Sequence, residues 1–180
     1  EVVFDIETTG LSVSDGNRII SVGMVELIDG KRTGNDLEIT VNPGRDSEPG
    51  ALAVHKMTAE FLSQFQPFAA HAETIRDFID NDPLIITCRT ENRDENPAYT
   101  LDIEFLRMEL QKTGIRPVPD TQWINVRRWS EELFGQVGAR LDNVFNHYKD
   151  QLPAADLKLK EVRAAAGHGA ERQLPCEALR

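Results

Sequence analysis

Residues 3–10 read VFDIETTG, and this stretch decides the fold and the chemistry that we expect. Its valine, phenylalanine and isoleucine favour a β-strand. Because side chains two apart on a strand share a face, Asp5 and Glu7 present two carboxylates side by side, while Phe4 and Ile6 point into a core. Two such charges repel unless a cation lies between them, and oxygen ligands suit Mg²⁺ or Mn²⁺. The alternative is a strand with one solvated face and no chemical role for the acids.

The composition indicates one soluble domain. The 180 residues are 40% hydrophobic and 28% charged, which is ordinary for a globular protein that buries a sizeable core. No apolar run is long enough to span a membrane, and no signal peptide is recognisable. The two cysteines, Cys88 and Cys176, suggest reduced thiols in a cytoplasmic protein. We expect a single domain over residues 1–180, with trimmed termini because the chain opens in a strand without an initiator Met.

The net charge of −10 limits the partners. A protein that grips long duplex nucleic acid by its phosphates is usually basic, so this chain should not coat DNA. It is still suited to a short chain end if bound metal ions offset its carboxylates. The acidity is equally compatible with no nucleic acid at all.

The first forty residues predict an antiparallel meander of three strands. Ile19 to Ile28 is rich in isoleucine and valine, Asp29-Gly30 is a hairpin signal, and Leu37 to Val41 alternates polar and apolar residues. Helices are predicted after this region, with a further short strand over 83–87. The helical pattern over 99–111 places Asp102 in its first turn, and the segment 124–134 reads as a strand end or a short helix. The other predicted helices lie within 50–64, after Pro67, at 141–148 and at 157–162. Strands first and helices later favour an α/β fold, a mixed sheet with helices packed on it.

With these segments in place, the chain resembles the DEDD superfamily of 3′-to-5′ exonucleases, and within it the proofreading epsilon subunits of bacterial DNA polymerase III. The resemblance runs from residue 1 to about 172. Four segments carry it in the right order: FDIETTGL at 4–11, IISVG at 19–23, VNPG at 41–44 and VHKMT at 54–58.

The resemblance implies a ribonuclease-H-like fold with a five-stranded mixed sheet, two divalent cations (Mg²⁺ or Mn²⁺) held by four acids, and a histidine base. Such a metal pair, about 4 Å apart, activates a water and stabilises the leaving oxygen. Asp5 and Glu7 match the first two acids and Asp102 the third, although an acid in a first turn is also favoured by the helix dipole alone. His168 matches the base, which is the DEDDh pattern. Thr8, Leu11 and His55 match positions that contact the terminal nucleotide; Leu11 and His55 read equally well as ordinary loop and core residues.

The fourth acid is missing. Five residues after His168, where the family has Asp, stands Gln173, which offers a carbonyl oxygen but no charge. Glu171 and Glu177 are the nearby acids, and Pro175 argues against a regular helix that would carry Glu177 to the site.

Two functions follow. The first is a metal-dependent 3′-to-5′ exonuclease on single-stranded DNA ends, with RNA as a further substrate and polymerase subunits as partners. The second is a catalytically impaired module of the same fold, which binds nucleic-acid ends or a polymerase partner.

Further residues could contact nucleic acid. Two arginines suit either phosphate contact or a solvated helix face: Arg127 and Arg128. Two tryptophans could stack on bases, but packing within the protein explains them better: Trp123 and Trp129.

Overall fold

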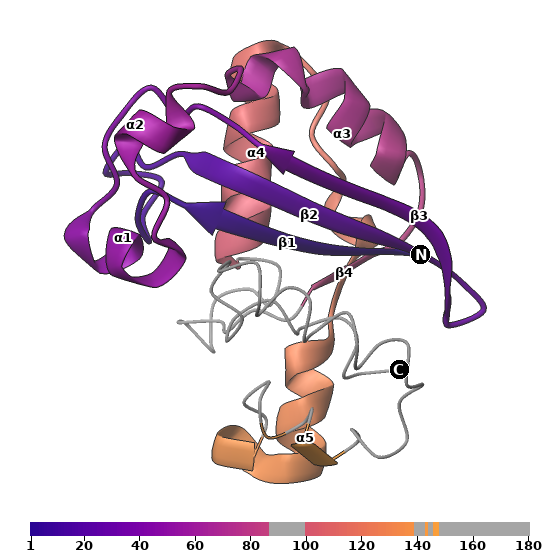
Figure 1. Ribbon diagram of the computed structural model, residues 1–180. Helices are drawn as coiled ribbons and strands as arrows, with labels where there is room; N and C mark the ends of the chain where they lie inside the picture. Colours follow the sequence, from indigo (N-terminus) through magenta and orange to yellow (C-terminus); the bar gives the residue numbers. More distant parts are fainter. Residues whose placement is uncertain (87–99, 139–142, 144–145, 148–180) are drawn as a thin grey trace.

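The computed structural model describes residues 1–86, 100–138, 143, 146 and 147, which form a five-stranded sheet with helices packed on it (Figure 1). The strand order is β3-β2-β1-β4-β5. The first three strands pair antiparallel, and β4 and β5 run parallel to β1. The predicted α/β fold with a mixed five-stranded sheet is confirmed. The strands are β1 (Val2–Thr8), β2 (Ile19–Ile28), β3 (Lys31–Thr40), β4 (Leu84–Ile86) and β5 (Trp123–Asn125).

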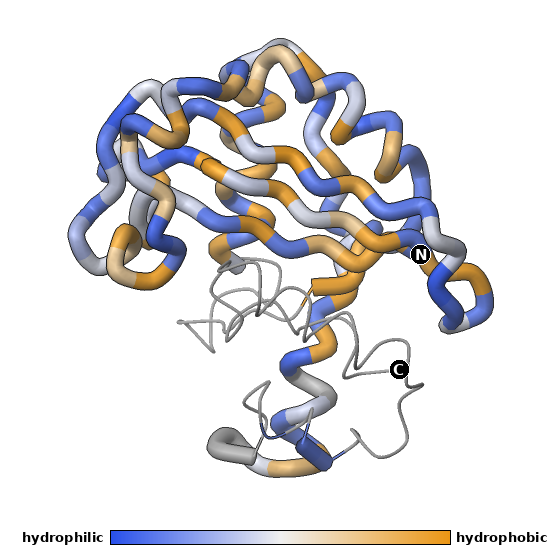
Figure 2. The backbone as a smooth tube through the Cα atoms, viewed as in Figure 1, coloured by the Kyte–Doolittle hydropathy of each residue, from blue (hydrophilic) through white to orange (hydrophobic). Residues whose placement is uncertain are grey.

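Strand β1 lies at the centre of the sheet and behaves as its sequence predicts. Phe4 and Ile6 are buried in the core, whereas Asp5 and Glu7 are only half-buried. The same alternation of hydrophobic and hydrophilic residues is visible along the strands in Figure 2. The register with β2 pairs Asp5 with Gly23, so a residue without a side chain stands beside the first acid. The two acids therefore share the face that the core does not occupy.

The third strand begins earlier than the sequence predicts. Asp29 and Gly30 both have positive φ, 52° and 71°, as a two-residue hairpin turn requires. Pairing therefore resumes at once, with Lys31 opposite Ile28, and β3 covers Lys31–Thr40 instead of Leu37–Val41. The prediction was wrong because residues 31–36 lack apolar alternation. On an edge strand with little burial, main-chain pairing to β2 is enough to hold them.

Six helices of the described chain surround the sheet or extend from it, besides the short η2. They are α1 (Pro49–His55), α2 (Ala59–Leu62), η1 (Phe68–Ala70), α3 (Ala72–Ile79), α4 (Leu101–Thr113) and α5 (Val126–Gly138), with η2 at Asp120–Gln122. Figure 1 shows α4 crossing the sheet, and its residues Ile103, Phe105, Leu106 and Leu110 are buried in the core with Phe4. The helix predicted over 99–111 is confirmed, with Asp102 in its first turn.

The helix predicted after Pro67 is interrupted. His71, with φ −116° and ψ −3°, caps both helices, so η1 ends at Ala70 and α3 begins at Ala72. His71 stands at this junction, between the two helices. The segment 124–134 contains both alternatives that the sequence left open, since β5 runs directly into α5.

The later predicted helices fall largely outside the described residues. Of the segment 141–148, residues 143, 146 and 147 are described and helical, and the segment 157–162 is not described. Within the described part of the chain, no helix has the length and apolarity needed to cross a membrane.

Candidate active site

Asp5 and Glu7 are positioned by the pairing of β1 with β2. Their partners across the strands are Gly23 and Ser21, and the register slips just after Glu7, between Glu7 and Thr8. The slip bends the strand end, where the buried Thr8 donates its Oγ1 hydroxyl to the Gly10 carbonyl oxygen at 2.6 Å. This turn fixes the direction in which the chain leaves the two acids. Sequence reasoning predicted the shared face, and the structure places both carboxylates on it.

Asp102 is the second residue of α4, and only 8% of its surface is exposed. Thr100 precedes the helix in an extended conformation and makes no side-chain cap. A negative charge at this end is favoured by the unpaired N–H groups and the helix dipole. Burial of a carboxylate is costly unless donors or a cation compensate it. The position suits a metal ligand, and it also suits a charge that the helix end stabilises.

His55 ends α1 and is buried, with 9% of its surface exposed. Its Nδ1 accepts a hydrogen bond from the Met57 N–H at 3.0 Å, and burial lowers its pKa. The ring is therefore neutral at pH 7 with its proton on Nε2. That buried Nε2 atom has no hydrogen-bond partner in the part of the chain that the structure describes. His55 thus holds a donor ready for a ligand oxygen.

Leu11 lies just beyond the first motif with 74% of its surface exposed. Of the roles that the sequence left open, packing in the core is wrong for Leu11. An exposed leucine four residues after Glu7 offers an apolar contact for a flat ring or a sugar. It stays a candidate substrate-contacting residue.

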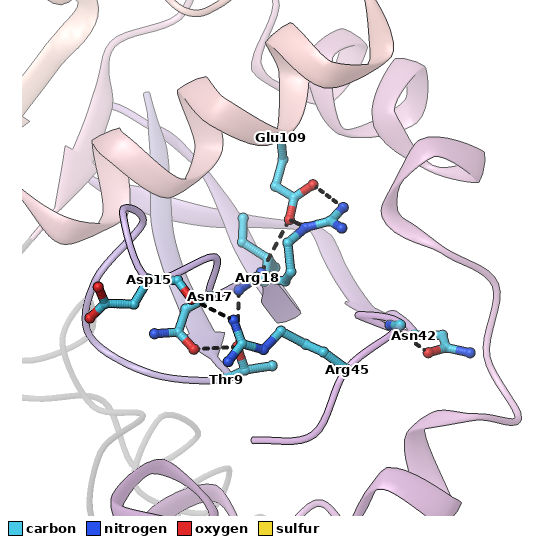
Figure 3. Close-up of polar contacts among 9 residues, drawn as sticks. Thr9, Asp15, Asn17, Arg18, Asn42, Arg45 and Glu109 are labelled. Carbon is cyan, nitrogen blue, oxygen red and sulfur yellow. Dashed lines mark hydrogen bonds and ion pairs between the residues drawn. The ribbon is translucent and has the colours of Figure 1, made fainter. Parts of the chain in front are cut away.

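Arg18, which is half-buried, and Glu109, which is buried, form an ion pair that the sequence did not predict. Arg18 Nε and Nη2 donate to Glu109 Oε1 and Oε2 at 2.6 and 2.7 Å, and the Ile19 N–H reaches Oε1 at 3.4 Å. Figure 3 shows the Glu109 side chain extending from its helix to Arg18. The bond to Glu109 raises the pKa of the Arg18 guanidinium. The pair joins α4 to the start of β2.

A second network closes the loop that follows β1. Thr9 Oγ1 donates to Asn17 Oδ1 at 2.9 Å, and Asn17 Nδ2 donates to Glu48 Oε1 at 2.7 Å. The Glu48 N–H donates in turn to the Thr9 carbonyl oxygen at 2.7 Å. Gly10 lies inside this ring with no room for a side chain, because an added Cβ would come within 2.5 Å of Glu48 Cδ. The network ties the end of β1 to the segment before α1.

A weak sequence signal for the ion pair existed. Glu109 interrupts the apolar face of a predicted helix seven residues after Asp102, which places both acids on one side of the helix. Its partner is 91 residues away in the chain, so only the fold brings the two together.

The sequence implies divalent cations, and the ligand atoms present are of the right chemical type. Asp5, Glu7 and Asp102 offer the carboxylate oxygens that Mg²⁺ and Mn²⁺ prefer. Among the described residues alone, no group of three or more His, Cys, Asp or Glu side chains is arranged to hold a metal ion. His168 and Gln173 lie outside the described residues, as do Glu171, Pro175 and Glu177.

Two other candidates have contacts within the protein. The Trp123 ring meets the Phe4 ring edge to face, with centroids 5.8 Å apart, so it lies against the core. Arg127 Nε donates to Glu131 Oε1 at 3.0 Å along α5. The Arg128 and Trp129 side chains lie outside the description.

The chain matches known proteins over most of its length. A family model described as "Exonuclease" (RNase_T) matches residues 2–170. The DNA polymerase III subunit epsilon of Buchnera aphidicola is 31% identical over 154 residues, which cover 82% of this chain and 61% of that protein. The epsilon subunit of Escherichia coli is 32% identical over 123 residues, which cover 63% of this chain and 47% of that protein. The chain thus spans less than two thirds of these relatives.

Solved structures share the fold. Exonuclease X in complex with 5′-overhanging duplex DNA has a TM-score of 0.54 at 18% identity, over 85% of this chain and 76% of that one. The metal-free form of the E. coli exonuclease I complex with single-stranded DNA has a TM-score of 0.64 at 14% identity, over 81% and 34%. The exonuclease fold predicted from the sequence is confirmed.

Proposed function

Because the chain belongs to the exonuclease family and resembles the epsilon subunits of DNA polymerase III, we propose that it is a metal-dependent 3′-to-5′ exonuclease. It removes nucleotides one at a time from single-stranded DNA ends and releases nucleoside monophosphates. The observation that carries this proposal is the pair of half-buried carboxylates, Asp5 and Glu7, on the non-core face of the central strand. We take residues 1–180 as one exonuclease domain.

The residues have separate roles in this proposal. Asp5, Glu7 and Asp102 would hold two divalent cations, Mg²⁺ or Mn²⁺, and His168 would act as the general base toward water, as in a DEDDh site. When bound, such cations supply an activated water and stabilise charge on the leaving oxygen. Asp5 and Glu7 carry two negative charges on neighbouring positions of one strand face, which is why we assign cations to this end of β1.

Substrate contacts come from the loop after β1 and the end of α1. The exposed Leu11 side chain offers an apolar surface to the terminal base. His55 Nε2 is a buried donor without a partner among the described residues, and it suits an oxygen of the terminal nucleotide. The Thr8 hydroxyl donates to the Gly10 carbonyl oxygen, so it contributes by shaping the turn and by its remaining lone pairs.

The wider setting is also part of the proposal. The net charge of −10 favours a short single-stranded end over a long duplex. RNA ends are a second substrate of the same chemistry. DNA polymerase subunits are the proposed protein partners, and the cytoplasm is the proposed compartment.

A second candidate function rests on Gln173. With an amide where the family has its fourth acid, the site has one negative charge fewer, which weakens the hold on a cation. The chain would then be an impaired exonuclease-like module that binds nucleic-acid ends or a polymerase partner.

One experiment separates the two candidates. A 5′-labelled single-stranded DNA is incubated with Mn²⁺ and the unchanged chain, its Asp5→Ala variant or its Gln173→Asp variant. A ladder shortened from the 3′ end by the unchanged chain, and lost in Asp5→Ala, supports the enzyme. Cutting by Gln173→Asp alone supports the impaired module. If none of the three cuts, the exonuclease proposal is refuted and only the fold remains.

A further inference from the structure

We propose that the ion pair between Arg18 and the buried Glu109 fixes Asp102 relative to the strand that carries Asp5 and Glu7, and so sets the affinity of the site for divalent cations. This inference rests on the proposed function. Neither Arg18 nor Glu109 has a role as a ligand here. Both act on the site as positioning residues.

Arg18 is attached to the end of the acidic strand by its main chain. The Thr9 N–H donates to the Arg18 carbonyl oxygen at 2.9 Å, and the Arg18 N–H donates to Thr9 Oγ1 at 3.0 Å. Thr9 lies two residues after Glu7, so Arg18 follows any displacement of that end of β1. Its main chain is thereby bound to Thr9 in both directions.

Glu109 is attached to Asp102 by the helix that both belong to. Seven residues are nearly two turns, so the two acids lie on the same side of α4, about 10 Å apart along its axis. The Glu109 carboxylate is 1% exposed and receives Arg18 Nε and Nη2 on its two oxygens. This two-point contact fixes orientation as well as distance.

Helix α4 also contacts the hydrophobic core through Ile103, Phe105, Leu106 and Leu110. Apolar packing is non-directional, and it tolerates small rotations and shifts better than a planar fork does. For stability alone, an apolar residue in place of the buried Glu109 would serve as well as its charge. The choice of a directional contact, on the helix face that carries Asp102, therefore points to positioning of that carboxylate.

The test measures Mn²⁺ binding to the full chain without DNA, by electron paramagnetic resonance titration of free Mn²⁺. Glu109→Gln keeps the shape but turns an amide donor toward Arg18 Nη2. Arg18→Lys keeps the charge but loses the fork, and it serves if the first variant folds poorly. Asp120→Asn is the matched control, because it removes a partner of Arg107, which lies on α4 away from this face. Ile79→Val controls for a loss of stability in the core.

We expect Mn²⁺ to bind about tenfold more weakly to Glu109→Gln and to Arg18→Lys, as when groups that orient metal ligands are altered. The Mn²⁺ concentration for half-maximal digestion should rise in parallel, and both controls should bind like the unchanged chain. Affinity within about twofold of the unchanged chain, with only a lower melting temperature, would overturn the inference.

An Asp5→Ala sample measured in parallel keeps the two proposals distinguishable. If Asp5→Ala loses Mn²⁺ binding and the ion-pair variants do not, the positioning role alone fails. If Asp5→Ala binds Mn²⁺ like the unchanged chain, the metal site of the proposed function fails, and the positioning role fails with it.

Discussion

Gly10→Ala should destabilise the protein strongly, although Gly10 has an ordinary backbone conformation. A Cβ built there lies 2.5 Å from Glu48 Cδ and 2.6 Å from Asn17 Cγ, about 1 Å inside normal contact. Glu48 can swing toward solvent, but Asn17 is fully buried and bonded to Thr9 Oγ1. The new methyl group must therefore separate Asn17 from Glu48, whose hydrogen bond measures 2.7 Å.

The size of the effect follows from two contributions. Forcing an extra methyl group into a packed site costs about 1–3 kcal/mol. Losing a hydrogen bond to a charged acceptor costs about 1.5–3 kcal/mol more. We expect a loss of about 3 kcal/mol in the free energy of unfolding, and a fall of about 6–12 °C in melting temperature for a domain of this size.

Urea unfolding followed by circular dichroism measures this loss, and Gly50→Ala is the matched control. Gly50 lies in the first turn of α1, and an added Cβ there meets nothing within 4 Å. The same substitution should therefore raise stability by about 0.5–1 kcal/mol, as alanine replaces glycine in a helix. The reasoning is refuted if Gly10→Ala changes stability by less than about 0.5 kcal/mol, or if the two variants change it in the same direction.

Two further predictions concern the end of α1. Lys56 has φ 59°, a left-handed conformation that costs a residue with a side chain about 1–2 kcal/mol. Glycine avoids this cost but loses about 0.5–1 kcal/mol more conformational entropy on folding. Lys56→Gly should therefore stabilise the chain by up to about 1 kcal/mol. The same urea titration measures it, and a loss of stability would contradict it. Burial lowers the pKa of His55 in the folded protein. As the pH falls below about 6.5, the unfolded chain therefore binds a proton at His55 before the folded chain does. The folded protein loses stability from that pH down to the folded-state pKa. His55→Asn keeps an acceptor for Met57 but does not titrate, so between pH 7.5 and 5.5 it should lose less stability than the unchanged chain; an equal loss would argue against burial as the cause.

The sequence predicted the parts of the site that depend on local pattern. The alternation around Asp5 and Glu7 is set by the strand itself, and Asp102 in a first turn follows from helical periodicity. The start of β3 was missed, because an edge strand is held by main-chain pairing that leaves no hydropathy pattern. The Arg18–Glu109 pair was missed for a different reason, since its partners are brought together only by the docking of α4 on the sheet.

The exposure of Leu11 shows another limit of pattern reading. A leucine after Thr-Thr-Gly reads equally as core or as surface, and only the turn fixed by Thr8 and Gly10 decides that it points outward. The roles of His168 and Gln173 stay predictions from the sequence.

The central claim is that the acids at the end of β1 support metal-dependent removal of 3′-terminal nucleotides. The most direct measurement is a time course with single-stranded DNA labelled at its last 3′ nucleotide, with Mn²⁺ present and EDTA added midway. The account predicts that the label appears first as a mononucleotide, that its release stops when EDTA is added, and that Asp5→Ala releases none. Release of the label in longer fragments, or release that continues in EDTA, would contradict it.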